Sequence, residues 1–154
     1  RKVLKKVELK AARLGVKMNL SEDKLYLICL LGALMTSVSN VDGHFDDSEK
    51  KVFKKELSDH FDFKGKEFKI LFEVILELTG HGFDFHEVTT ELNNLVAYNK
   101  KVGITNCILA VGAADGELSH EEAEEIRRIT KALRIPHKVF IEAKMKVLSR
   151  LRRL

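Results

Sequence analysis

Hydrophobic residues recur along most of the chain at intervals of three and four, the spacing that places them on one face of an α-helix. Two segments, residues 25–41 and 104–114, are apolar nearly all round, so we expect both at the centre of the fold. No stretch of useful length alternates apolar and polar residues as a β-strand would. The pattern therefore predicts an all-α fold of about seven to eight helices with two central apolar helices. The expected helices cover residues 1–15, 25–41, 46–61, 66–79, 84–99, 104–114, 119–133 and 136–151.

Two segments repeat one another, with Asp115 standing 73 positions after Asp42. The first reads LMTSVSNVDGHFDDSEKKVF and the second CILAVGAADGELSHEEAEEI. In each, an apolar helix leads into Asp-Gly, a helix-capping residue follows, and a glutamate stands three positions later, as in a capping box. The capping pairs are Asp46 with Glu49 and Ser119 with Glu122. This duplication predicts two pseudo-symmetric helical repeats, at about residues 22–80 and 84–152, with their apolar helices paired.

The loops between the repeated helices are acidic in an unusual place. Asp42 and Asp115 follow helix C-termini, where the helix dipole disfavours a carboxylate by up to about 1 kcal/mol. On one interpretation the loops are only tight corners, in which Gly43 and Gly116 adopt a left-handed turn. On the other interpretation, a bound cation reverses the electrostatic cost of placing a carboxylate at the helix C-terminus.

Oxygen ligands converging from such a loop suit Ca²⁺ or Mg²⁺. Neither loop is an EF-hand, because the glycine follows the first aspartate directly. The first loop has His44 where a second oxygen ligand is wanted, so the second loop is the better equipped. The candidate metal ligands are Asp42, Asp46 and Glu49 in the first copy and Asp115, Glu117, Ser119 and Glu122 in the second.

At these loops the sequence resembles the TerB-like (tellurite resistance) domains. The resemblance rests on helix-ADG-x-hydrophobic-S-x-x-E, matched closely by residues 114–122 and loosely by residues 41–49, and on the later stretch LRIPHKVF. It covers about residues 22–150 and implies a single domain over residues 21–154, preceded by a basic amphipathic helix at residues 1–20. It also implies a cytoplasmic, metal-binding, stress-response module near membrane-associated complexes. The first copy departs from the motif at Val41 and Asp46, which weakens its implied metal role.

Basic residues dominate both ends of the chain, with seven Lys or Arg against Glu8 alone in residues 1–20. A solvated face is the simplest explanation, and contact with a membrane surface or a protein partner is the alternative. With no Trp and two Tyr, nothing indicates base stacking, so we expect no specific nucleic acid partner. The longest apolar run, residues 25–35, is too short for a transmembrane segment.

Other candidate chemistry is sparse. Cys29 and Cys107 lie in apolar segments, as inert core thiols in a reducing cytoplasm do, and no Gly-rich nucleophile turn accompanies them. His81, His86 and Glu87 could hold a transition metal, but two histidines five residues apart across a loop are weak evidence, and a helix start with Asp84 as its cap is the better explanation of this stretch. We therefore expect no enzyme and no organic cofactor.

The sequence thus predicts a cytoplasmic, TerB-like, non-enzymatic helical module that binds a divalent cation in a tellurite or metal stress response. The alternative is a metal-independent scaffold, peripheral to the membrane, that docks to a protein or lipid surface through its basic first helix or its acidic loop surface. The sequence does not identify the partner.

Overall fold

The structure, a computed structural model, describes residues 2–15, 21–39, 46–61 and 83–152, together with residues 65–66, 69–70, 73–74 and 77. The described part contains seven helices and no strand, so the predicted all-α fold is confirmed. None of these helices combines the length and the apolar character that a membrane crossing requires. The helices are α1 (Lys2–Arg13), α2 (Glu22–Ser39), α3 (Asp47–Phe61), α5 (Phe85–Leu95), α6 (Tyr98–Gly112), α7 (His120–Ala132) and α8 (His137–Arg152).

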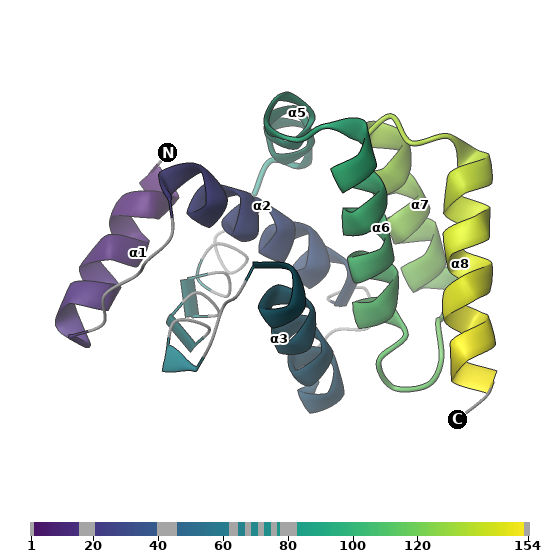
Figure 1. Ribbon diagram of the computed structural model, residues 1–154, viewed down its shortest axis with the longest axis horizontal. Helices are drawn as coiled ribbons and strands as arrows, with labels where there is room; N and C mark the ends of the chain where they lie inside the picture. The colour runs from purple at the N-terminus through teal and green to yellow at the C-terminus, as the bar shows by residue number, and fades with distance from the viewer. Residues whose placement is uncertain are drawn as a thin grey trace.

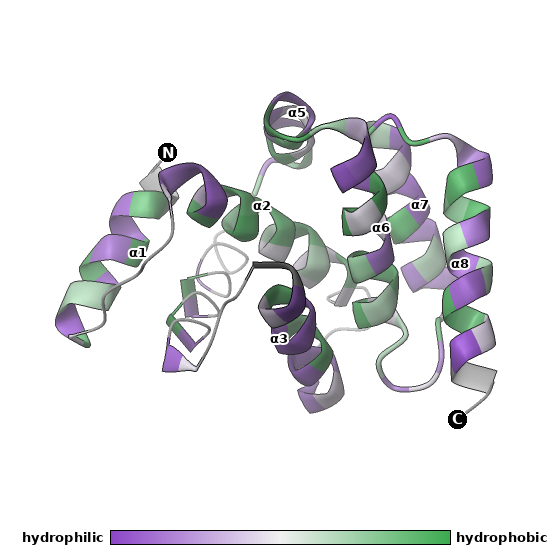
Figure 2. Ribbon diagram, viewed as in Figure 1, coloured by the Kyte–Doolittle hydropathy of each residue, from purple (hydrophilic) through white to green (hydrophobic). Residues whose placement is uncertain are grey.

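The two apolar helices, α2 and α6, form the centre of the molecule and contact each other directly. Every residue of α2 from Leu25 to Thr36 is buried, because apolar side chains surround the helix instead of forming one stripe. The remaining helices pack around this pair: α3 lies against α6, and α7 and α8 lie on its other side (Figure 1). Figure 2 shows α2 hydrophobic over most of its length, whereas α3, α7 and α8 carry both hydrophobic and hydrophilic residues.

The two central helices approach closely near their C-terminal ends. Gly112, the last residue of α6, lies against α2, because a Cβ built there would stand 3.5 Å from Val38 Cγ1. The same Cβ would lie 3.2 Å from the terminal methyl carbons of both Leu118 and Ile126. A residue without a side chain is therefore needed where α6 passes between α2 and α7.

The basic first helix packs on α2 through the apolar face that its spacing predicts. Leu4, Val7 and Ala11 are all buried and join the main hydrophobic core. At a half-buried position of this helix, the Lys10 ammonium nitrogen lies 3.9 Å from a carboxylate oxygen of Glu73 and 3.7 Å from one of Glu77. The predicted helix at residues 66–79 lies largely outside the described residues.

One helix boundary differs from the prediction. A helix was expected over residues 84–99 and another from residue 104, but α5 ends at Leu95 and α6 already begins at Tyr98. Val96 and Ala97 are extended, at φ −120° and −72°, and the carbonyl of Ala97 accepts the first hydrogen bonds of α6. Val96 is still buried, so its helix-like spacing reflects core packing and not helical backbone.

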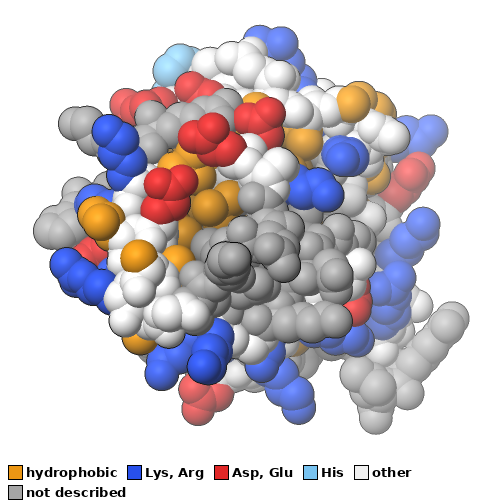
Figure 3. All heavy atoms as spheres, turned by 60° about the vertical axis from the view of Figure 1, so that its left-hand side comes forward, with side chains coloured by type: hydrophobic (Ala, Val, Ile, Leu, Met, Phe, Trp, Pro, Cys, Tyr) orange, Lys and Arg blue, Asp and Glu red, His pale blue; other side chains and the backbone are white. Residues whose placement is uncertain are grey.

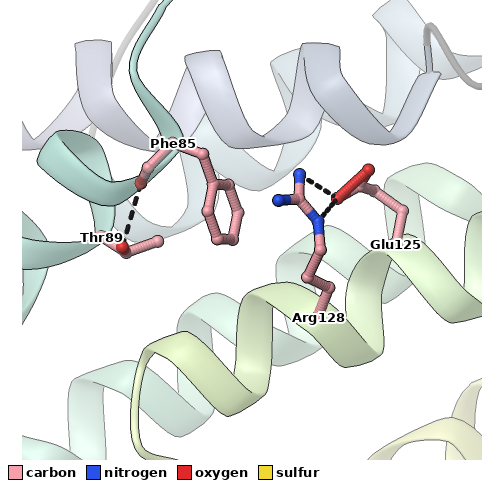
Figure 4. Close-up of polar contacts among 4 residues, drawn as sticks. All are labelled: Phe85, Thr89, Glu125 and Arg128. Atoms are coloured by element: carbon pink, nitrogen blue, oxygen red, sulfur yellow. Dashed lines mark hydrogen bonds and ion pairs between the residues drawn. The ribbon is translucent and has the colours of Figure 1, made fainter.

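The N-terminal end of α5 is attached to α7 by polar contacts. The guanidinium of Arg128 lies 3.6 Å from the centre of the Phe85 ring and pairs with Glu125 at 2.7 Å (Figure 4). At the other end of α5, Asn93 Nδ2 donates to the carbonyl of Ala132 at 3.0 Å. A cation–π contact at a half-exposed site stabilises by about 0.5–1 kcal/mol, so these contacts orient α5 more than they hold the fold together.

The stretch LRIPHKVF makes the turn between α7 and α8. Arg134 adopts φ 61°, and the backbone N–H groups of Arg134 and Ile135 donate to the carbonyls of Lys131 and Thr130. This is the Schellman pattern that ends a helix, with arginine where glycine is usual. Pro136 follows, and α8 begins one residue after this predicted start, at His137; the carbonyl of Pro136 accepts the N–H groups of Val139 and Phe140.

Both cysteines are buried thiols, as predicted. Burial raises the pKa of Cys29 to about 12. Burial also raises the pKa of Cys107, and the charge of Glu56 raises it further. The Cys107 thiol donates to Glu56 Oε2 at 3.3 Å. Both thiols therefore stay protonated at neutral pH, which makes them poor nucleophiles.

Two helical glycines provide a matched test of the packing. We expect Gly112→Val to lower the free energy of unfolding by about 1–3 kcal/mol, because the added atoms meet side chains of α7 and the adjoining loop. Gly103→Ala places a Cβ where no described atom lies within 4 Å, so it should raise the free energy of unfolding by up to about 1 kcal/mol through helix propensity. Urea unfolding of both variants measures this, and equal stabilisation by both would contradict the close approach.

Candidate functional site

The second acidic loop, which we call the second acidic corner (residues 113–122), forms a complete turn between α6 and α7. Gly116 has φ 95°, the left-handed conformation predicted for it. Asp115 Oδ1 accepts the backbone N–H of Glu117 at 3.0 Å, which closes the turn locally. Ser119 and Glu122 form the predicted capping box, with both reciprocal hydrogen bonds at 3.0 Å.

The described part of the first acidic corner (residues 40–49) repeats the capping box. Asp46 Oδ1 accepts the backbone N–H of Glu49 at 2.9 Å, and Glu49 Oε1 accepts that of Asp46 at 3.3 Å. The hydroxyl of Ser48 also donates to Asp46 Oδ1 at 2.6 Å. Asp42, with Gly43 and His44, lies outside the described residues. Both copies thus use their glutamate to cap a helix, which confirms the capping pattern read from the sequence.

Glu49 is the unusual member of this group. Its side chain is buried, with 7% of its surface exposed, although only Oε1 takes part in the capping box. The other oxygen, Oε2, is shielded from solvent and has no hydrogen-bond partner among the described residues. The hydroxyl oxygen of Ser39, at the end of α2, is buried too; it lies near enough to Glu49 to lower the pKa of that carboxyl, although the two groups fall short of full hydrogen-bond geometry. A buried carboxylate oxygen without a partner costs free energy, so it indicates an incomplete coordination or hydrogen-bonding arrangement.

The two acidic corners act on each other electrostatically. Burial is the largest effect on Glu49 and raises its pKa. The nearby Ser39 hydroxyl and the Asp46 backbone N–H lower the pKa, and the charges of Asp46 and Asp115 raise it. The net effect is a pKa above the ordinary value. Asp115 belongs to the second copy, so a charge of the second corner acts on a carboxylate of the first, as the smallest of these effects.

The helix ends add negative potential to this region. Both α2 and α6 end here, and neither has a basic residue in its last turn. The carbonyl ends of two helices therefore face the region that also carries Glu49 and Asp115, without the Lys or Arg that usually offsets the dipole.

The family model of the tellurite resistance protein TerB matches residues 30–145 of the 154-residue chain, a span that includes both acidic corners. The chain belongs to the TerB family. No curated protein and no solved structure matches it significantly.

Within the described residues, the TerB domain gathers no group of three His, Cys, Asp or Glu side chains that could hold a metal ion. In the second corner, Asp115 and Glu117 are exposed, whereas Glu122 is buried in its capping box. Asp84 caps α5 by accepting the Glu87 backbone N–H at 3.0 Å, and His86 is exposed. His81, the other histidine considered there, lies outside the described residues.

Sequence reasoning missed Ser39. It stands before the Asp-Gly motif, at the end of a predominantly apolar helix, and is not among the predicted metal ligands. The repeat could have identified Ser39, because the equivalent position of the second copy is Gly112, where the two central helices approach closely. Ser39 thus lies at the same structural junction in the first copy.

The capping box of the second corner gives a direct test. We expect Ser119→Ala to lower the free energy of unfolding by about 1 kcal/mol, because the N–H of Glu122 loses its acceptor. Ser149→Ala, at an exposed position on α8, is the control and should change stability by less than about 0.5 kcal/mol. Equal stability of the two variants by urea unfolding would show that the Ser119 cap contributes nothing.

Proposed function

We propose that this TerB domain is a non-enzymatic module that binds one divalent cation between its two acidic corners. Glu49 and Asp115 supply carboxylate oxygens, and the Ser39 hydroxyl supplies a neutral one. Asp42 follows the end of α2 in the sequence, so it is the expected additional carboxylate. The cation would neutralise charge at the junction of the two copies.

The observation that supports this most strongly is the unpartnered Oε2 of Glu49. An ionised carboxylate removed from water is strongly unfavourable unless a counter-charge or hydrogen bonds compensate. Burial is the largest cause of the raised pKa of Glu49; the Ser39 hydroxyl and the Asp46 N–H offset part of it, and the charges of Asp46 and Asp115 add smaller unfavourable contributions. A bound cation removes the desolvation cost and the repulsion together.

Capping and cation binding are compatible at Glu49, because each uses a different oxygen of the same carboxylate. Oε1 accepts the N–H of Asp46 at the start of α3, and Oε2 takes no part in that hydrogen bond. In the second corner, Ser119 and one oxygen of Glu122 are occupied by the capping box, and Glu117 is exposed. The proposed ion therefore depends on Glu49 and Asp115 more than on the other predicted ligands.

The donor atoms favour a hard cation. Carboxylate and hydroxyl oxygens suit Ca²⁺ and Mg²⁺, whereas Zn²⁺ favours nitrogen and sulfur. The two thiols are buried in the core, and the Cys107 thiol donates a hydrogen bond to Glu56, a residue outside both corners. We infer that the ion is Ca²⁺ or Mg²⁺.

The biological setting follows from the family. Because the chain belongs to the family described as tellurite resistance protein TerB, we infer a role in a cytoplasmic response to tellurite or metal stress. In such a role, the bound cation would stiffen the junction of the two copies. A protein partner would then recognise the stiffened form when the ion is available. No step of this role requires catalysis.

Thermal unfolding with and without millimolar Ca²⁺ or Mg²⁺ tests the proposal. At a concentration one hundred times the dissociation constant, a ligand that binds only the folded state stabilises it by about 2.7 kcal/mol, so the melting temperature should rise by several degrees. Asp115→Ala should remove most of that rise, because it deletes one of the two carboxylates.

The matched control is Glu142→Ala, which removes the same charge from an exposed position on α8. It should retain the full cation-induced shift. A melting temperature unchanged by either ion in the unsubstituted protein, or an equal shift in both variants, would count against the proposed site.

A second function, docking on an anionic membrane surface, is favoured by the outer face of α1. Leu9 is 61% exposed in the middle of that face, with Lys5 and Arg13 one turn before and after it. On the side of the molecule that Figure 3 brings forward, hydrophobic side chains are exposed among Lys and Arg side chains. An apolar side chain within a basic helical face is typical of interfacial helices.

Co-sedimentation with vesicles containing anionic lipid tests this docking. We expect binding at low salt that weakens at high salt, because the attraction is screened. Leu9→Ser should weaken it, whereas Met145→Ser should not, although Met145 is also an exposed side chain between lysines, on α8. Absence of salt-sensitive binding would exclude the membrane form of docking.

A further inference from the structure

A cleft of about 260 Å³ lies between the central helices, at the opposite end of α6 from the acidic corners. Its walls are largely apolar and come from the N-terminal halves of α2 and α6 and from the extended link before α6. The lining residues are Leu27, Leu31, Val96, Asn99, Lys100, Gly103, Ile104 and Cys107. No function described above uses this cleft.

Gly103 gives the first indication that the cleft accommodates a ligand. It lies inside α6, where glycine costs up to about 1 kcal/mol relative to alanine. Gly112 in the same helix is explained by close packing, but a Cβ on Gly103 would meet no described atom within 4 Å. The missing side chain therefore leaves open space at the cleft wall instead of permitting a helix contact.

The two ends of the cleft differ in charge. Asn99 and Lys100, both exposed, lie in the first turn of α6. That turn has no acidic residue, and Ala97 as N-cap provides no side-chain hydrogen bond, although Asn99 Oδ1 accepts the backbone N–H of Lys100 at 3.0 Å. At the other end, Cys107 donates to the carboxylate of Glu56. An anionic group is thus favoured beside Lys100, where the helix dipole is positive, and disfavoured beside Cys107.

We propose that the cleft binds a single-chain carboxylate amphiphile of the fatty acid class. Its alkyl chain packs against Leu27, Leu31 and Ile104 and over the bare backbone of Gly103. Its carboxylate pairs with the Lys100 ammonium group, at the positive end of the α6 dipole. The volume of the cleft limits the size of the ligand. Ligand pockets usually measure about 300–1,000 Å³, so this smaller cleft accepts one short alkyl chain and not a two-chain lipid.

Calorimetric titration of the full chain with decanoate, below its micelle concentration, tests the proposal, with decanol as the uncharged probe. We expect saturable one-to-one binding of decanoate. Gly103→Leu fills the cleft and should weaken that binding at least tenfold, whereas the melting temperature should not fall. Lys100→Gln should weaken decanoate severalfold and leave decanol unchanged, and Lys146→Gln, on α8, should alter neither.

If Gly103→Leu perturbs folding, Gly103→Ala provides the second variant, since it narrows the same space with a residue that favours helix. A graded loss of affinity from glycine through alanine to leucine supports the site. Absence of saturable binding, or equal affinity in the glycine and leucine forms, overturns it. Equal effects of Lys100→Gln on decanoate and decanol overturn the assignment of the carboxylate. None of these results depends on the cation, whose proposed site lies at the other end of α6.

Discussion

The close crossing of α2 and α6 is the constraint on which the rest of this structure depends. Because Gly112 has no side chain, the C-terminal end of α6 lies against Val38 near the end of α2. The loops that follow these two helices are the acidic corners, so the packing that buries the core also brings like charges together. Burial raises the pKa of Glu49, and the charge of Asp115 from the other copy adds a smaller contribution. The proposed cation site depends on this arrangement of the core.

Much of the fold could be predicted from the sequence because several local signals agree. The apolar character of α2, the capping box at Ser119 and Glu122, and Pro136 at the start of α8 each specify their element without tertiary information. The break at Val96 and Ala97 was missed, because a buried residue at helical spacing looks the same in an extended link. Periodicity reports burial, and backbone conformation follows from it only when a capping signal is also present.

The candidate site was predictable only in part, for a similar reason. Sequence motifs identify residues that are neighbours along the chain, so the capping pairs were found in both copies. The unpartnered oxygen of Glu49, its proximity to Ser39 and the influence of Asp115 all arise from contacts between segments distant in sequence. The duplicated motif also suggested equivalent roles, yet among the described residues Glu49 is influenced by Asp115, which is not its equivalent in the repeat.

The most direct test of this account is the free energy of unfolding of Glu49→Gln against the unsubstituted protein, in chelator and in millimolar Ca²⁺. Glutamine retains the capping box but not the charge. Since the pKa of Glu49 is raised in the folded state, the unsubstituted protein in chelator should lose stability as pH rises from the ordinary glutamate pKa through the raised one. At pH 7 the variant should therefore be the more stable in chelator and should not respond to Ca²⁺. A variant that is less stable in chelator, and that gains as much from Ca²⁺ as the unsubstituted protein, would contradict the account.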